Sequence, residues 1–93
     1  PEPSTPQPSS DEARIVMSAM ATLRARGDAT SARADLERYL VRYPHGVLVE
    51  EALGLLMEAA RTPEEARAAA RRYLDRFPSG RFSTVARRTL ERP

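Results

Sequence analysis

Residues 47–60 read VLVEEALGLLMEAA and form the most apolar stretch of this 93-residue chain. Their apolar residues recur at helical spacing on two separate faces, one that begins at Leu48 and one that begins at Val49. The first face holds Leu48, Ala52, Leu55, Leu56 and Ala59, and the second holds Val49, Leu53, Met57 and Ala60. Only Glu50, Glu51 and Glu58 remain to face water, so we expect a central helix that is covered on two sides.

The sequence around this central helix repeats. When the chain is aligned with itself at an offset of 34, residues 32–56 match residues 66–90 at eleven of twenty-five positions. The identical pairs are Ala32/Ala66, Arg33/Arg67, Ala34/Ala68, Arg38/Arg72, Tyr39/Tyr73, Leu40/Leu74, Arg42/Arg76, Pro44/Pro78, Gly46/Gly80, Ala52/Ala86 and Leu56/Leu90. The aromatic-Pro-x-Gly turns at 43–46 and 77–80 also coincide, which indicates two copies of one unit.

Helix start and stop signals divide the chain into five helices. Ser9 and Glu12 have capping-box spacing, Gly27 with Asp28 ends the first helix, and Thr62 with Pro63 starts the fourth. The expected helices cover about residues 10–26, 29–43, 47–61, 63–77 and 81–92. The last is expected to be apolar on one side only, through Phe82, Val85, Ala86, Thr89 and Leu90.

The aromatic residues favour a helix interface rather than a peptide-binding stripe. Tyr39 and Tyr43 are four residues apart, as are Tyr73 and Phe77, so each pair lies on one face of a helix. We expect these rings to pack between helices, with the tyrosine hydroxyls reaching the surface.

Composition separates a linker from a domain and gives no sign of catalysis. Residues 1–10 (PEPSTPQPSS) are predicted to be a disordered proline-rich linker, and residues 11–93 a single helical domain. The chain has no cysteine, and its one histidine, His45, lies in a predicted turn. Because no nucleophile, metal-ligand or phosphate-loop pattern is present either, we expect a non-enzyme without a metal ion or cofactor.

The charges are distributed unevenly, although the formal net charge is +2. Residues 1–65 hold seven arginines and eleven acidic residues, whereas residues 66–93 hold eight arginines and two acidic residues. A solvated face, an acidic protein or lipid partner, and nucleic acid are the three interpretations of this basic end, in that order. The candidate partner-binding residues are Arg71, Arg72, Arg76, Arg87, Arg88, Glu51 and Glu58.

A 34-residue helix-turn-helix period resembles the tetratricopeptide repeat. Residues at the family's characteristic places are the Leu53-Gly54 pair, the Gly27-Asp28 turn, the small residues Ala32 and Ala66, and the closing prolines Pro44 and Pro78. Glu50 stands where the family has an aromatic residue, and Arg61 where it has a turn glycine. Arg87 and Arg88 replace the Leu-Gly pair in the last helix, which is typical of a terminal helix that caps a stack.

This resemblance implies a fold and a function class. The expected fold is all-α: a right-handed antiparallel superhelix of two helical hairpins and a C-terminal capping helix. The RYP and RFPSG turns are similar to those of bacterial cell-envelope members of the family, such as outer-membrane assembly lipoproteins and cell-division coordinators. The implied function is a protein–protein interaction module of a larger envelope or membrane-anchored regulatory protein.

Several alternatives to that function remain open. The alternatives are a basic helical nucleic-acid-binding domain and a structural domain that associates with itself. The expected location is the periplasm or cell envelope, with the cytoplasm as the alternative, and no membrane insertion by these residues is expected because no apolar run is long enough.

Overall fold

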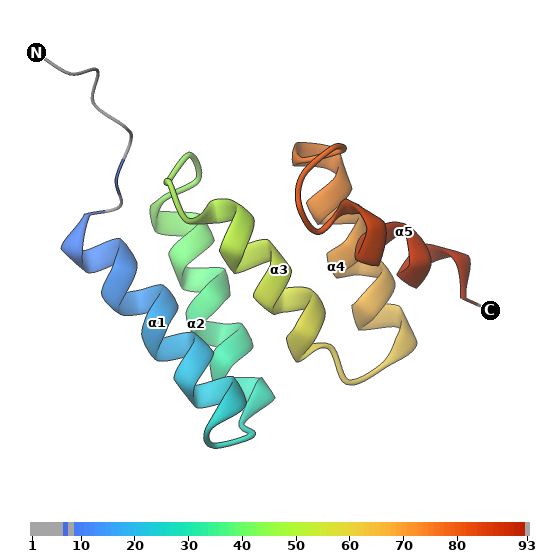
Figure 1. Cartoon of the computed structure of the whole chain (residues 1–93). Helices are drawn as coiled ribbons and strands as arrows, with labels where there is room; N and C mark the ends of the chain where they lie inside the picture. The colour runs from blue at the N-terminus through green and yellow to red at the C-terminus, as the bar shows by residue number, and fades with distance from the viewer. Residues whose placement is uncertain (1–6, 8, 93) are drawn as a thin grey trace, which may run out of the picture.

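The computed structural model describes residue 7 and residues 9–92, and these form five helices (Figure 1). The helices are α1 (Ser10–Arg24), α2 (Ala29–Arg42), α3 (Val49–Ala59), α4 (Pro63–Arg76) and α5 (Ser83–Glu91). The predicted all-α class with five helices is confirmed. Residues 1–6 and 8 of the predicted linker lie outside the described residues, whereas Ser9 caps α1 and Ser10 begins it.

The predicted helix boundaries rest on identifiable caps. Ser9 and Glu12 form a complete capping box at the start of α1. Gly27 has a φ of 66°, the left-handed conformation that glycine adopts readily, and lies between α1 and α2. The side chain of Thr62 accepts the N–H of Glu65 at 3.1 Å, and Pro63 is the first residue of α4.

The helices lie in two layers (Figure 1). One layer contains α1, α3 and α5, and the other contains α2 and α4. Each helix contacts the next along the chain, and α1 also contacts α3. Within the first layer, Gly54 of α3 lies against the ring of Phe82, where a Cβ atom would fall 2.8 Å from Cε2. The right-handed winding of such a stack remains a prediction.

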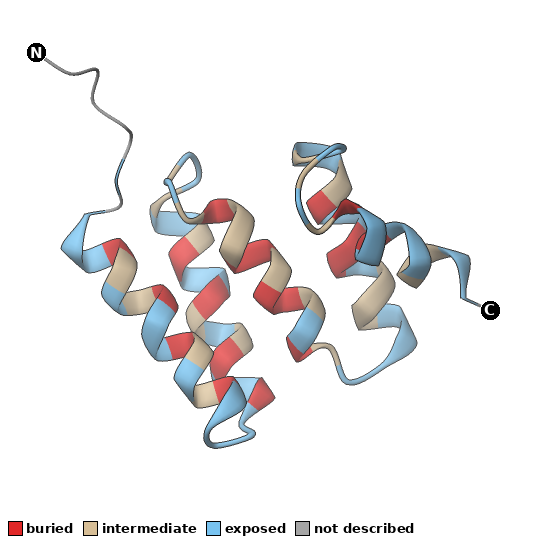
Figure 2. Ribbon diagram, viewed as in Figure 1, coloured by how far each residue is buried: buried red, intermediate tan, exposed pale blue. Residues whose placement is uncertain are grey.

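The central helix α3 carries the largest share of the core (Figure 2). Its buried residues are Val49, Ala52, Leu53, Leu55, Leu56 and Ala59, which come from both predicted faces. The prediction that three glutamates face water was wrong for two of them, because Glu50 and Glu51 are half-buried and only Glu58 is exposed. Both half-buried carboxylates bind groups that precede α5, as described below.

Two other predictions need correction. The helices α3 and α5 begin two residues later than expected, because Leu48 and Phe82 serve as N-caps. The N–H groups of Leu48 and Phe82 donate to tyrosine hydroxyls and not to a helical carbonyl oxygen. Val85 is 53% exposed, so α5 buries Ala86 but not the whole predicted stripe.

We predict that Leu53→Ala lowers the free energy of unfolding by about 2–5 kcal/mol, because it removes a fully buried side chain and leaves a cavity. Val41→Ala is the control, since Val41 is 83% exposed on α2. Denaturant unfolding followed by circular dichroism measures both variants. A loss that is equally small for the two would contradict a core centred on α3.

Candidate functional site

A hydrogen-bonded cluster joins α1, α2 and the turn that precedes α3. The hydroxyl of Tyr39 donates to Oε1 of Glu12 at 2.8 Å and accepts the N–H of Leu48 at 3.1 Å. The other carboxylate oxygen of Glu12 accepts the N–H of Ser9 at 3.1 Å. Tyr39 is only 1% exposed, and Glu12 is buried with it. We call Glu12, Tyr39 and Leu48 the first Tyr–Glu cluster.

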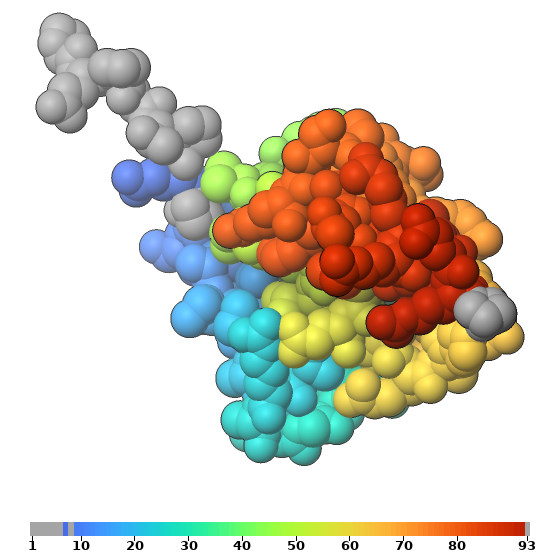
Figure 3. All heavy atoms as spheres, turned by 45° about the vertical axis from the view of Figure 1, so that its right-hand side comes forward, coloured from blue at the N-terminus to red at the C-terminus, as the bar shows by residue number. Residues whose placement is uncertain are grey.

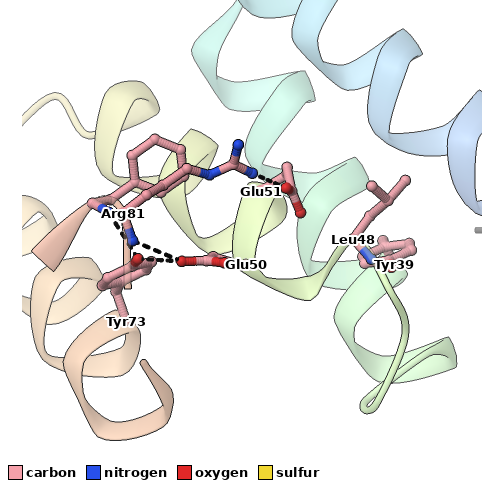
Figure 4. A network of polar contacts seen from close by, with 7 residues as sticks. Tyr39, Leu48, Glu50, Glu51, Tyr73 and Arg81 are labelled. Carbon is pink, nitrogen blue, oxygen red and sulfur yellow. Dashed lines mark hydrogen bonds and ion pairs between the residues drawn. The ribbon is translucent and has the colours of Figure 1, made fainter. Parts of the chain in front are cut away.

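The second hairpin contains the same arrangement (Figure 4). The hydroxyl of Tyr73 donates to Oε2 of Glu50 at 2.6 Å and accepts the N–H of Phe82 at 2.9 Å. Oε2 of Glu50 also accepts the N–H of Arg81 at 3.1 Å. We call Glu50, Tyr73 and Phe82 the second Tyr–Glu cluster. The hydroxyls of Tyr39 and Tyr73 thus lie inside the protein, so the prediction that the tyrosine hydroxyls reach the surface was wrong for these two residues.

The clusters explain the glycines of the two aromatic-Pro-x-Gly turns. A Cβ atom on Gly46 would fall 2.6 Å from Oη of Tyr39 and closer still to the carboxylate of Glu12. Gly80 stands in the same relation to Tyr73. A side chain at either position would therefore push the turn away from the hydroxyl that anchors it.

Burial and hydrogen bonding shift the proton equilibria of the clusters. The N–H of Ser9, and after it the hydroxyl of Tyr39, hold the pKa of Glu12 below its ordinary value of 4.5. Burial, and after it the hydrogen bond to Glu12, raises the pKa of Tyr39 to about 12. Burial likewise raises the pKa of Tyr73. At neutral pH, the first cluster therefore pairs the neutral phenol of Tyr39 with the carboxylate of Glu12.

The two acidic candidate residues connect neighbouring parts of the stack. Glu58 of α3 forms a two-bond ion pair with Arg24 of α1, with N···O distances of 2.9 and 2.8 Å. Glu51 of α3 pairs with Arg81, which lies in the turn before α5 (Figure 4). Both carboxylates therefore hold the α1, α3 and α5 layer together.

Three of the five basic candidates are also bound within the protein. Arg72 of α4 pairs with both oxygens of Glu37 on α2, at 3.0 and 2.8 Å. Arg76 donates to the carbonyl oxygen of Pro44 at 2.8 Å, and Arg87 donates to that of Pro78. Arg72 and Arg76 thus tie α4 to the first hairpin.

The other two basic candidates, Arg71 and Arg88, are exposed and make no hydrogen bond or ion pair to another described residue. They belong to a larger set of arginines from α4 and α5 that have no carboxylate partner within the described residues. This set is Arg67, Arg71, Arg76, Arg87, Arg88 and Arg92. Within the described residues, Arg72 and Arg76 therefore connect α4 to the first hairpin, whereas the side chains of Arg71 and Arg88 have no partner.

Sequence reasoning missed a groove of about 820 Å³ between α1 and α2. Its walls include Ile15 and the exposed Val41, with Arg14, Asp35 and Arg38 along its edge. Arg14 pairs with Asp11, and Arg38 pairs with Asp35, so these edge charges are largely balanced within the helices. The groove offers apolar contact area but little uncompensated charge.

The described residues include no group of three or more side chains suited to hold a metal ion. None of the described helices has the length and apolar character needed to cross a membrane. His45 is exposed in its turn, as predicted. No protein-family model, no curated protein and no solved structure matches the chain. The candidate site therefore rests on the geometry of these residues alone.

We predict that Tyr73→Phe destabilises the fold by about 1–3 kcal/mol, because the Glu50 carboxylate and the Phe82 N–H both lose a partner. Tyr43→Phe is the matched control, since the half-buried Tyr43 makes no hydroxyl hydrogen bond to a described residue. Thermal unfolding of both variants gives the comparison. Equal melting temperatures would show that the second cluster adds nothing to stability.

A second prediction concerns the stability of the fold at acidic pH. Because the pKa of Glu12 is lower in the folded protein than in the unfolded chain, its contribution to stability is present above about pH 4.5 and is lost as the pH falls through the folded pKa. Asp28, Glu58 and Glu65 have lowered pKa values too. The free energy of unfolding should decrease below about pH 4.5, and less steeply in Glu12→Gln. Denaturant titrations across this range check the slopes, and identical slopes would contradict the role of Glu12.

Proposed function

We propose that this chain is a non-catalytic protein–protein interaction module with a tetratricopeptide-like architecture. Its mechanism is the presentation of a rigid helical surface to a partner protein, without chemical change to either. The observation that supports this most directly is the division among the arginines. Arg72 and Arg81 pair with acidic residues of α2 and α3, while Arg71 and Arg88 are exposed and their side chains have no partner within the described residues.

The rigidity that this mechanism needs comes from contacts between the hairpins. The second Tyr–Glu cluster fixes α3, α4 and the start of α5 relative to one another. The ion pairs Arg24–Glu58, Arg33–Glu65 and Arg72–Glu37 each join one hairpin to the next. Helices that are held in place by such contacts lose little backbone freedom when a partner binds.

We further propose that the module belongs to a larger bacterial envelope or membrane-anchored regulatory protein and works in the periplasm. This proposal rests on the RYP and RFPSG turns, whose resemblance to envelope repeat proteins is described above. The right-handed superhelix is part of the same proposal. The two hairpins, with their equivalent clusters, support the repeat on which it depends.

A basic nucleic-acid-binding domain is the second candidate, since unpaired arginines also neutralise phosphates. The burial of the aromatic side chains does not favour this candidate. Tyr39 and Tyr73 are buried, and Phe77 and Phe82 are half-buried beneath Arg76 and Arg81, so these rings offer little surface for base stacking.

We predict that the immobilised chain retains specific envelope proteins of its own bacterium, and that Arg71→Glu combined with Arg88→Glu abolishes most of that retention. Both arginines are free of partners among the described residues, so the substitutions remove binding charge without breaking an internal contact. Quantitative mass spectrometry of the retained proteins is the measurement. Arg26→Glu is the matched control, because Arg26 is exposed in the α1–α2 turn and has no ion pair to a described residue.

Two results would contradict the proposal. A salt-dependent shift of labelled DNA or RNA, with no retained protein, would favour the nucleic-acid-binding candidate. Sedimentation that depends on concentration, with no other protein retained, would favour a self-associating domain.

A further inference from the structure

We propose that the side of α4 that faces away from α2 binds an acidic amphipathic helix of a partner protein. The inference rests on the proposed function and names both the surface and the chemistry of its partner. The surface consists of Arg67 and Arg71 on α4 with Leu90 on α5, and we call it the Arg67/Arg71/Leu90 surface.

The argument starts from the way in which α4 itself covers α2. Nη1 of Arg33 lies 2.9 Å from Oε2 of Glu65, and Arg72 binds both oxygens of Glu37. Between these two ion pairs, Leu56 of α3 lies at the base of a small depression of about 290 Å³ and is 4% exposed. An ion pair on each side of a buried leucine therefore fixes one helix against its neighbour.

The 34-residue repeat places the equivalents of Arg33, Glu37 and Leu56 on the side of α4 that faces away from α2. Arg33 is equivalent to Arg67, Glu37 is equivalent to Arg71, and Leu56 is equivalent to Leu90. Leu90 is only half-buried, although the equivalent Leu56 is buried. Figure 3 shows α5 and the beginning of α4 side by side on an open face of the molecule. No described helix is joined to this side by ion pairs of the kind that join α4 to α2.

Arg71 is exposed and Arg67 is half-buried, and neither has a carboxylate partner among the described residues. Nη2 of Arg67 donates only to the carbonyl oxygen of Arg92, at 3.2 Å, and has no carboxylate partner among the described residues. Arg71 is exposed and makes no hydrogen bond or ion pair to them. Because Arg71 stands where α2 has a glutamate, this surface carries two positive charges where α2 carries one of each sign.

The sequence that α4 presents to α2 defines what the partner helix needs. Glu65, Ala68, Ala69 and Arg72 line the depression, at positions i, i+3, i+4 and i+7 of one helix face. A helix in the equivalent place requires small apolar residues at i+3 and i+4. It requires an acidic residue at i, to meet Arg67, and a second one at i+7, because Arg71 replaces the glutamate.

The acidic pairs of this chain itself do not fill that role. Asp28 and Asp35 have the required spacing, but the first caps α2 and the second pairs with Arg38. Glu51 and Glu58 also have it, and both are bound by arginines of the same layer. Among the described helices, a second copy therefore offers none with two free carboxylates at this spacing, and the proposed ligand is a different polypeptide.

The test is the binding of a labelled helical peptide of about 15 residues with Glu at i and i+7 and Ala at i+3 and i+4. A second peptide of the same composition carries its second Glu at i+5, on another face. We expect fluorescence anisotropy to show preferential binding of the first peptide, weakened about tenfold or more by Arg67→Glu combined with Arg71→Glu. Circular dichroism establishes that this variant remains folded.

Arg26→Glu is the control, because Arg26 is exposed in the α1–α2 turn, away from α4 and α5, and has no ion pair to a described residue. This substitution should leave peptide binding unchanged. Equal affinity for the two peptides, or equal loss with Arg26→Glu, would overturn the inference. Binding of anionic phospholipid vesicles or DNA in place of the peptide would also overturn it. Loss of envelope-protein retention with Arg71→Glu combined with Arg88→Glu, without any binding of the first peptide, would leave the proposed function standing while this inference fails.

Discussion

In each hairpin, the structure depends on a buried tyrosine hydroxyl that both donates and accepts a hydrogen bond. It donates to a carboxylate of the first helix and accepts the N–H that precedes the following helix. A buried phenol or carboxylate without such partners would cost about 1–3 kcal/mol, and more for the charged group. Because three segments share one hydroxyl, the position of each helix pair determines where the next helix begins.

This constraint accounts for features that otherwise look unrelated. The turns need glycine because backbone passes directly beside the hydroxyl and the carboxylate. Glu50 accepts from Tyr73 and from the backbone before α5, a role that an aromatic side chain at this position could not fill. The exposed ion pairs between hairpins add little energy individually, so their main effect is to orient neighbouring helices. The arginines that this framework leaves without a partner among the described residues are the ones on which the proposed function depends.

The sequence predicted the elements that depend on local signals and on the repeat, including the caps at Ser9 and Thr62 and the central position of α3. It did not predict the clusters, because Glu12 precedes its tyrosine by 27 residues and Glu50 precedes its own by 23, so an offset of 34 cannot align them. In the sequence, charge alone identifies the candidate partner-binding residues. Glu58 and Arg72 are engaged by partners 34 and 35 residues away, a pairing that only the packing of the hairpins creates.

Backbone amide hydrogen exchange tests the central claim most directly, because it observes the N–H groups that the tyrosine hydroxyls accept. Leu48 and Phe82 should exchange only with global unfolding, at similar rates and as slowly as the core of α3. The neighbouring turn residues His45 and Ser79, which are exposed, should exchange much faster. Fast exchange at Leu48 and Phe82, equal to that of the two turn residues, would contradict a fold fixed by the Tyr–Glu clusters.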